Sequence, residues 1–108
     1  MVFSQELKKI TEKIKNKSSV KKIILFGSYA TGNQQENSDF DLCIITDFKD
    51  KKINIIREIR ELIAPIVNHP LDILVYTEEE FNIRAEHKST MEYTIKRDGI
   101  SLYDAHKS

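Results

Sequence analysis

The feature that most constrains the fold is a short polar turn between two apolar segments. Residues Val20–Phe26 predict a buried β-strand, and the Gly27-Ser28 dipeptide after them predicts a turn. A second strand is predicted from about Asp39 to Thr46, and it is apolar on both faces beyond Asp41. A strand with two apolar faces belongs in the centre of a sheet that is covered on both sides. The acidic residues Asp39 and Asp41 would then lie at the solvent-exposed end of this strand.

Two of these acids are expected to act together. Asp39 and Asp41 are two residues apart, so in a strand their side chains point to the same face. Two neighbouring carboxylates repel each other unless a cation lies between them, and Mg2+ prefers such oxygen ligands. The Gly27-Ser28 turn can offer backbone N–H groups and a hydroxyl to phosphate oxygens. This combination indicates chemistry on a nucleoside triphosphate.

A third acid lies in a later apolar strand. Asp72 is the charged residue of Leu71–Tyr76, which follows a helix predicted from about Lys51 to Val67. If this strand neighbours the strand of Asp39 and Asp41, the two are about 4.8 Å apart. All three carboxylates could then reach one or two metal ions, which in two-metal sites clamp the attacking and leaving oxygens.

The remaining pattern predicts helices around a small sheet. Ser4 is expected to cap a helix that runs to about Asn16, and the segments 77–80 and 89–92 resemble capping boxes that open two later helices. Gly99 is suited to a left-handed helix cap before a short final strand, Ile100–Tyr103. The apolar stripe of the long helix is predicted to contain Ile56, Ile59, Ile63, Ile66 and Val67, widened by Ile53, Ile55 and Leu62. The fold class is therefore α/β (α+β), with helices packed on a small mixed sheet.

Composition limits the classes of protein that this chain fits. The 108 residues suffice for one small domain, residues 1–108. Lys and Arg number 17, as do Asp and Glu, so net charge gives no case for broad nucleic-acid or membrane binding. The lone Cys43 lies in an apolar strand and is expected in the core, where it forms no disulfide. No secretory signal or run of membrane-spanning length is present, so we expect a cytoplasmic protein.

Other sites that use an Asp-x-Asp pair fit less well. An EF-hand loop needs Gly at its sixth position and Glu at its twelfth, where this chain has Leu42 and Phe48. A P-loop needs Gly-Lys-Ser/Thr after Gly27, and this chain has none there. A glycosyltransferase Asp-x-Asp would leave the Gly-Ser turn unexplained.

The composite motif resembles a known family. The pattern G-S-x-A-x-G followed by S-D-x-D-L is matched at Gly27, Ser28, Ala30, Gly32, Ser38, Asp39, Asp41 and Leu42. With Asp72 as the third acid, the chain resembles minimal nucleotidyltransferases of the DNA polymerase β superfamily. The resemblance covers nearly the whole chain, including its ending at residues 97–103.

This resemblance implies an activity and the residues that carry it. The implied reaction transfers AMP from ATP to a hydroxyl, with loss of pyrophosphate and with Mg2+, in two ions, as cofactor. The nucleotide-binding residues that it implies are Gly27, Ser28 and Ser38. The catalytic, metal-binding residues that it implies are Asp39, Asp41 and Asp72, of which Asp72 also helps to deprotonate the acceptor.

The resemblance also implies a partner. Members this small are often antitoxins encoded beside a HEPN-domain ribonuclease toxin, and they are similar in adding AMP to a tyrosine of that toxin. Many relatives carry Arg where this chain has Tyr29 and Thr31, so phosphate would need a Lys or Arg from elsewhere. Two alternatives stay open: an antitoxin that neutralises by binding alone, and an adenylyltransferase for a small-molecule hydroxyl. A homodimer or a hetero-oligomer with the toxin is equally open.

Overall fold

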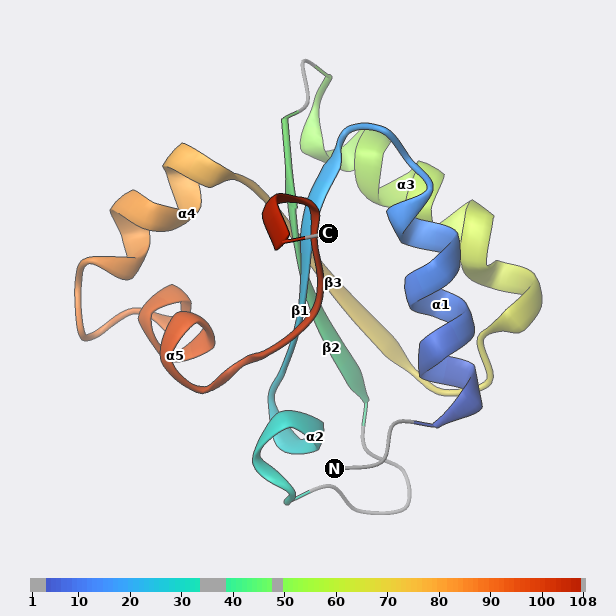
Figure 1. The fold of residues 1–108 in the computed structure, drawn as a ribbon, viewed down its shortest axis with the longest axis horizontal. Helices are drawn as coiled ribbons and strands as arrows, with labels where there is room; N and C mark the ends of the chain where they lie inside the picture. Colours follow the sequence, from blue (N-terminus) through green and yellow to red (C-terminus); the bar gives the residue numbers. More distant parts are fainter. Residues whose placement is uncertain (1–3, 34–38, 48–49, 108) are drawn as a thin grey trace.

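The computed structural model of the chain describes residues 4–33, 39–47 and 50–107 (Figure 1). In chain order its elements are α1 (Gln5–Lys15), β1 (Val20–Phe26), α2 (Ser28–Thr31), β2 (Phe40–Thr46), α3 (Lys52–Ile63), a 3-10 turn (Ala64–Ile66), β3 (Leu71–Thr77), α4 (Glu78–Ala85), α5 (Met91–Asp98), β4 (Ile100–Asp104) and a second 3-10 turn (Ala105–Lys107). The predicted order of helices and strands is confirmed.

The four strands form one mixed sheet in the order β3-β2-β1-β4. Strand β1 pairs antiparallel with both β2 and β4, whereas β2 and β3 run parallel because helix α3 carries the chain back between them. Strand β2 is therefore central, as its two apolar faces predicted. Its first residue follows directly after Asp39.

Helices cover both faces of the sheet (Figure 1). On one face, α1 and α3 pack against the strands through a core that includes Leu7, Ile10, Ile14, Ile55, Ile59 and Ile63. On the other face, α4 and α5 contribute Phe81, Ala85 and Ile95 to a smaller core. Cys43 lies in this second core and is fully buried, which confirms its predicted structural role. None of the helices in the described part of the chain has the length and apolar character that crossing a membrane requires.

Helix α3 is shorter than the sequence predicted. It ends at Ile63, and Pro65 lies in the 3-10 turn after it, because proline lacks the N–H that a continuing helix needs. Its buried stripe is Ile55, Ile59 and Ile63. The side chain of Ile53, which was expected to widen the stripe, is 68% exposed.

Two predicted helix caps were wrong in detail. Helix α5 is capped by Thr90 instead of Ser89, since the Thr90 hydroxyl accepts a hydrogen bond from the Tyr93 N–H at 3.1 Å. Gly99 has an extended backbone, with φ −69° and ψ 157°, instead of a left-handed one. Its N–H donates to the Ile95 carbonyl at 2.8 Å, and a Cβ there would collide with that carbonyl oxygen. Gly99 is needed for this close approach of α5 to the sheet.

Candidate active site

The parallel pairing of β2 and β3 brings two of the predicted acids together. In the register of the two strands, Asp41 is the direct partner of Asp72. Residues that alternate with them, such as Cys43 and Tyr76, belong to the core beneath α4 and α5, so both carboxylates lie on that face of the sheet. Asp41 is half-buried and Asp72 is exposed, which leaves the pair open to solvent on one side.

The electrostatics of Asp41 reflect this crowding. Burial raises the pKa of the Asp41 carboxyl from 3.8 to about 6, and the negative charges of Asp72 and Asp39 raise it further. A hydrogen bond between the Asp41 and Asp72 side chains contributes in the same direction. The Asp41 carboxyl therefore holds a proton more readily than an ordinary aspartic acid, and a divalent cation would take the place of that proton. An all-oxygen donor set of this kind suits Mg2+.

The remaining predicted acid, Asp39, lies beside the pair formed by Asp41 and Asp72. Asp39 is half-buried next to the start of β2 and acts on Asp41 through its charge. Within residues 4–33, 39–47 and 50–107, no three His, Cys, Asp or Glu side chains already stand close enough together to enclose a metal ion. The structure thus places Asp41 and Asp72 in contact and keeps Asp39 as their neighbour.

The Gly-Ser turn contacts the acids directly. Gly27 follows Phe26, the β1 residue that pairs with Asp41. Its backbone has φ 76° and ψ −153°, a conformation that is essentially restricted to glycine. A Cβ on Gly27 would also overlap a carboxylate oxygen of Asp41. Because Gly27 has no side chain, the Asp41 carboxylate can approach the backbone of the turn closely.

The short helix α2 follows this turn at the end of β1 (Figure 1). Gly27 begins it, and its carbonyl accepts hydrogen bonds from the N–H groups of Ala30 and Thr31 at 3.1 and 3.2 Å. Among the described residues the Ser28 hydroxyl has no hydrogen-bond partner, so it is free to donate to a ligand. Ser38, the remaining predicted nucleotide-binding residue, lies outside the described residues.

The two positions at which the chain departs from the family's arginines have structural roles. The Tyr29 ring packs on Phe40 with their centroids 4.7 Å apart. The Thr31 hydroxyl lies 3.3 Å from the Gly27 carbonyl oxygen, to which it donates a hydrogen bond. Tyr29 thus packs the Gly27-Ser28 turn against Phe40, the residue between Asp39 and Asp41.

Two supporting residues escaped the sequence analysis. The ring of His69, a loop residue, packs on Phe40 with the centroids 4.8 Å apart, and its Nδ1 lies 2.6 Å from a carboxylate oxygen of Glu6. Glu6 also accepts hydrogen bonds from the backbone N–H groups of Asn68 and His69. The residues are 63 positions apart, so no local pattern could have indicated the contact. Glu6 and His69 together support Phe40 at the start of β2, the strand that contains Asp41.

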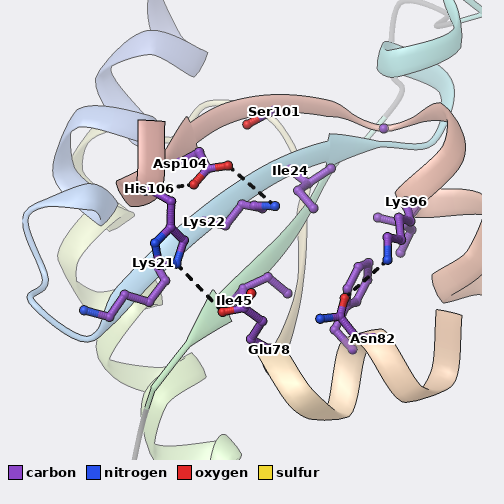
Figure 2. Close-up of a pocket in the computed structure, with 13 residues that line it drawn as sticks. Lys21, Lys22, Ile24, Ile45, Glu78, Asn82, Lys96, Ser101, Asp104 and His106 are labelled. Carbon is purple, nitrogen blue, oxygen red and sulfur yellow. Dashed lines mark hydrogen bonds and ion pairs between the residues drawn. The ribbon is translucent and has the colours of Figure 1, made fainter. Parts of the chain in front are cut away.

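A pocket lies away from the acids (Figure 2). It is bordered by residues of β1, β4, α4 and α5. Two ion pairs lie in it: the Lys22 ammonium is 3.6 Å from Asp104, and His106 is 3.9 Å from Glu78. The Lys96 ammonium contacts the side-chain oxygen of Asn82 at 3.5 Å. Because the pair of Asp41 and Asp72 lies elsewhere, we place the chemistry at the Gly27 end of the sheet.

Comparison with known proteins agrees with this geometry. Residues 7–97 match the family described as "Nucleotidyltransferase domain". A Methanocaldococcus jannaschii protein named "Putative protein adenylyltransferase" is 38% identical over 71 residues, which are 65% of this chain and 67% of that protein. A crystal structure of a toxin-antitoxin with AMP-PNP superposes with a TM-score of 0.64 at 23% identity, over 96% of this chain and 77% of the other. A mutant of the toxin-antitoxin MntA-HpeT gives a TM-score of 0.63 at 19% identity, over the same shares of the two chains.

Proposed function

Because this chain belongs to the nucleotidyltransferase domain family, and is thus a nucleotidyltransferase, we propose that it transfers AMP from ATP to a hydroxyl of a partner protein. The observation that carries this proposal is the pairing of Asp41 with Asp72 directly beside the glycine turn. That arrangement unites two carboxylates that can hold a cation, a glycine turn whose backbone can approach a phosphate, and an exposed carboxylate for the acceptor. The reaction is proposed to run in the cytoplasm.

The residues have separate roles in the proposed reaction. The backbone of the Gly27 turn would approach the triphosphate, and the Ser28 hydroxyl would donate to a phosphate oxygen. Asp41 and Asp72 would hold Mg2+, and Asp39 would complete the ligand set by turning its side chain toward them. When bound, Mg2+ stabilises negative charge on the attacking and leaving oxygens.

The bonds and protons balance without a further reactant. The acceptor oxygen forms a bond to the α-phosphorus of ATP, and the bond from that phosphorus to the bridging oxygen of the β-phosphate breaks. Pyrophosphate leaves with the electron pair of the broken bond. The proton of the acceptor hydroxyl passes to Asp72, the more exposed member of the acid pair.

We propose further that the acceptor is a tyrosine of a HEPN-domain toxin, which this chain would inactivate as an antitoxin. The M. jannaschii relative, named for adenylylation of protein, supports a protein acceptor. The structural neighbours that are toxin-antitoxins support a toxin as the partner. The name of the M. jannaschii relative makes a small-molecule hydroxyl the weaker candidate.

A second candidate is an antitoxin that neutralises its partner by binding alone. It is favoured by Tyr29 and Thr31, which stand where many relatives carry phosphate-binding arginines and which are engaged in packing and hydrogen bonding. Loss of those arginines would weaken the hold on triphosphate. Under this alternative the acid pair would be a structural cation site.

Intact-mass spectrometry of the toxin separates the two candidates. The product of the adjacent gene is incubated with this protein, ATP and Mg2+, and we expect a mass gain of one or more adenylyl groups. The gain should disappear with Asp41→Asn and persist with Asp47→Asn, an exposed acid just beyond the other end of β2. An unchanged mass in a stable complex would favour neutralisation by binding alone.

A further inference from the structure

The pocket drawn in Figure 2 has no role in the proposed function. It has a volume of about 160 Å³ and lies on the face of the sheet that α4 and α5 cover. Of the described residues that border it, none belongs to the Gly27-Ser28 turn or to the acid pair. Lys22 borders the pocket, whereas Phe26 is the strand partner of Asp41, and four residues of an antiparallel strand span about 14 Å. The pocket is therefore a separate site.

The floor of the pocket is apolar. Ile24, Ile45, Phe81 and Ile95 border it, and each of them belongs to the core beneath α4 and α5 and is at most 7% exposed. An apolar cavity of about 150 Å³ is large enough to bind benzene. Sites for larger small molecules begin at about 300 Å³. The pocket thus has room for one ring or one branched chain, and not for a nucleotide.

The rim of the pocket offers hydrogen-bond donors that are weakly engaged. The Lys96 ammonium reaches the uncharged side-chain oxygen of Asn82 at 3.5 Å, and in the described part of the chain it has no acidic partner. The Asn82 amide group has N–H donors of its own. The Ser101 hydroxyl, from β4, makes no hydrogen bond to any described residue. These three side chains come from three elements and border one space, so a single acceptor group can engage more than one of them.

The acids of the pocket leave this positive charge available. Figure 2 shows Asp104 on the side of the pocket opposite Lys96. Asp104 accepts a hydrogen bond from the His106 N–H at 2.9 Å and lies 3.6 Å from the Lys22 ammonium, and both contacts hold its pKa below the usual range. Glu78 is mostly exposed at the rim. Since the other two lysines of the pocket, Lys21 and Lys22, are paired with Asp47 and Asp104, Lys96 is the cation that a ligand can neutralise.

We propose that this pocket binds a small carboxylic acid whose apolar body is about the size of one ring. The apolar body would lie on the isoleucine floor, and the carboxylate would accept hydrogen bonds from the Lys96 ammonium and the Asn82 amide. A single available cation matches a singly charged carboxylate better than a doubly charged phosphate. The apolar floor disfavours inorganic anions, which have no apolar surface to bury. This site goes beyond the proposed nucleotide transfer and does not depend on it.

An NMR titration with benzoate tests the site. It is followed through the backbone amide signals of Ile24 and Ile45, in the absence of ATP and Mg2+. We expect signal shifts that saturate with benzoate. Benzamide has the same shape without the charge, and acetate has the charge without the ring, so each should bind about tenfold or more weakly.

Two variants locate the ligand, and each has a matched control. Lys96→Met keeps most of the apolar stem and removes the charge, so it should lose about tenfold in benzoate affinity, whereas Lys13→Met, at an exposed position of α1 on the opposite face, should lose none. Asn82→Phe fills the pocket from an exposed position and should abolish binding. Arg84→Phe places the same ring on the same helix at an exposed position that does not border the pocket, and it should bind like the wild type.

The outcomes that would overturn the proposal are distinct. Equal affinities for benzoate and benzamide, or an undiminished affinity in Lys96→Met, would overturn the assignment of a carboxylate to Lys96. Shifts that do not saturate, or benzoate binding that persists in Asn82→Phe, would overturn the site itself. Because these titrations contain neither ATP nor Mg2+, such failures leave the proposed nucleotide transfer intact, and a failure of that transfer leaves this site intact.

Discussion

Asp41 and Asp72 lie directly opposite each other on the parallel strands β2 and β3, and the charge of Asp72 adds to burial in raising the pKa of Asp41. In the absence of a cation this contact opposes folding at neutral pH, because burial and two neighbouring charges act on one carboxylate. The acid pair therefore makes the stability of the protein depend on both pH and divalent cations.

Asp41→Asn should stabilise the protein at pH 7 in the presence of a chelator. The pKa of Asp41 is raised to about 6 by burial and by the charges of Asp72 and Asp39, so its stabilising effect is complete below pH 3.8 and is lost as the pH rises through 6. Solvent screens the pair, so we expect a gain of about 1 kcal/mol, measured by urea denaturation. Mg2+ should stabilise the wild type and not the variant, and equal stabilisation of both would count against a cation at Asp41.

Gly27→Ala should be more harmful than Gly32→Ala. Both glycines have positive φ, at 76° and 80°, so both substitutions strain the backbone. The new Cβ meets Asp41 at Gly27, whereas no atom of residues 4–33, 39–47 and 50–107 lies within 4 Å of a Cβ built on Gly32. We expect Gly32→Ala to cost about 1 kcal/mol in unfolding free energy and Gly27→Ala about 1 kcal/mol more, with loss of nucleotide transfer. Equal costs with activity retained in both variants would show that the turn does not form part of the site.

The contact between Glu6 and His69 should contribute stability that disappears in acid. Burial tends to raise the pKa of Glu6, but hydrogen bonds from Asn68 and His69 and the charge of His69 bring it below its usual 4.5. A lowered pKa gives stability that is present above pH 4.5 and lost as the pH falls further. His69→Ala should cost about 1 kcal/mol at pH 7 and flatten the acid side of the stability profile, whereas His87→Ala, at an exposed loop position, should change neither. An unchanged acid profile in His69→Ala would show that the contact has no energetic role.

Tyr76→Phe should destabilise the protein although the ring is kept. The Tyr76 hydroxyl donates to the Glu92 carboxyl at 2.6 Å, and both residues are only 7% exposed. Without this donor a buried carboxyl group loses its partner, which costs about 1–3 kcal/mol. Replacing Glu92 with Leu in the Tyr76→Phe background should recover part of that loss in thermal unfolding. If the double variant is no more stable than the single one, the cost comes from packing and not from the unpaired carboxyl.

The acid site could be predicted from sequence because it depends on two local rules. The spacing of two places Asp39 and Asp41 on one face of a strand, and the parallel connection through α3 makes β2 and β3 neighbours. The family motif added the Gly-Ser turn. Whether Asp72 or Asp39 lies closer to Asp41 depends on side-chain positions, and the spacing of residues in the sequence does not determine these.

The features that the sequence did not predict depend on tertiary contacts. Isoleucines occur at so many positions of α3 that several stripes fit the pattern, and only packing on the sheet selects Ile55 over Ile53. Ser89 and Thr90 are adjacent hydroxyl residues, and the inward turn of Glu92 to meet Tyr76 decides which one caps α5. The closeness of Gly99 to Ile95 likewise appears only once α5 is docked.

The most direct test of the account is Mn2+ binding, measured by electron paramagnetic resonance in the presence of ATP and competed with Mg2+. We predict that the wild type and Asp47→Asn bind Mn2+ alike and that Asp41→Asn and Asp72→Asn lose this binding while remaining folded. Mn2+ binding that is undiminished in folded Asp41→Asn would contradict the assignment of Asp41 and Asp72 as the metal site of the nucleotidyltransferase.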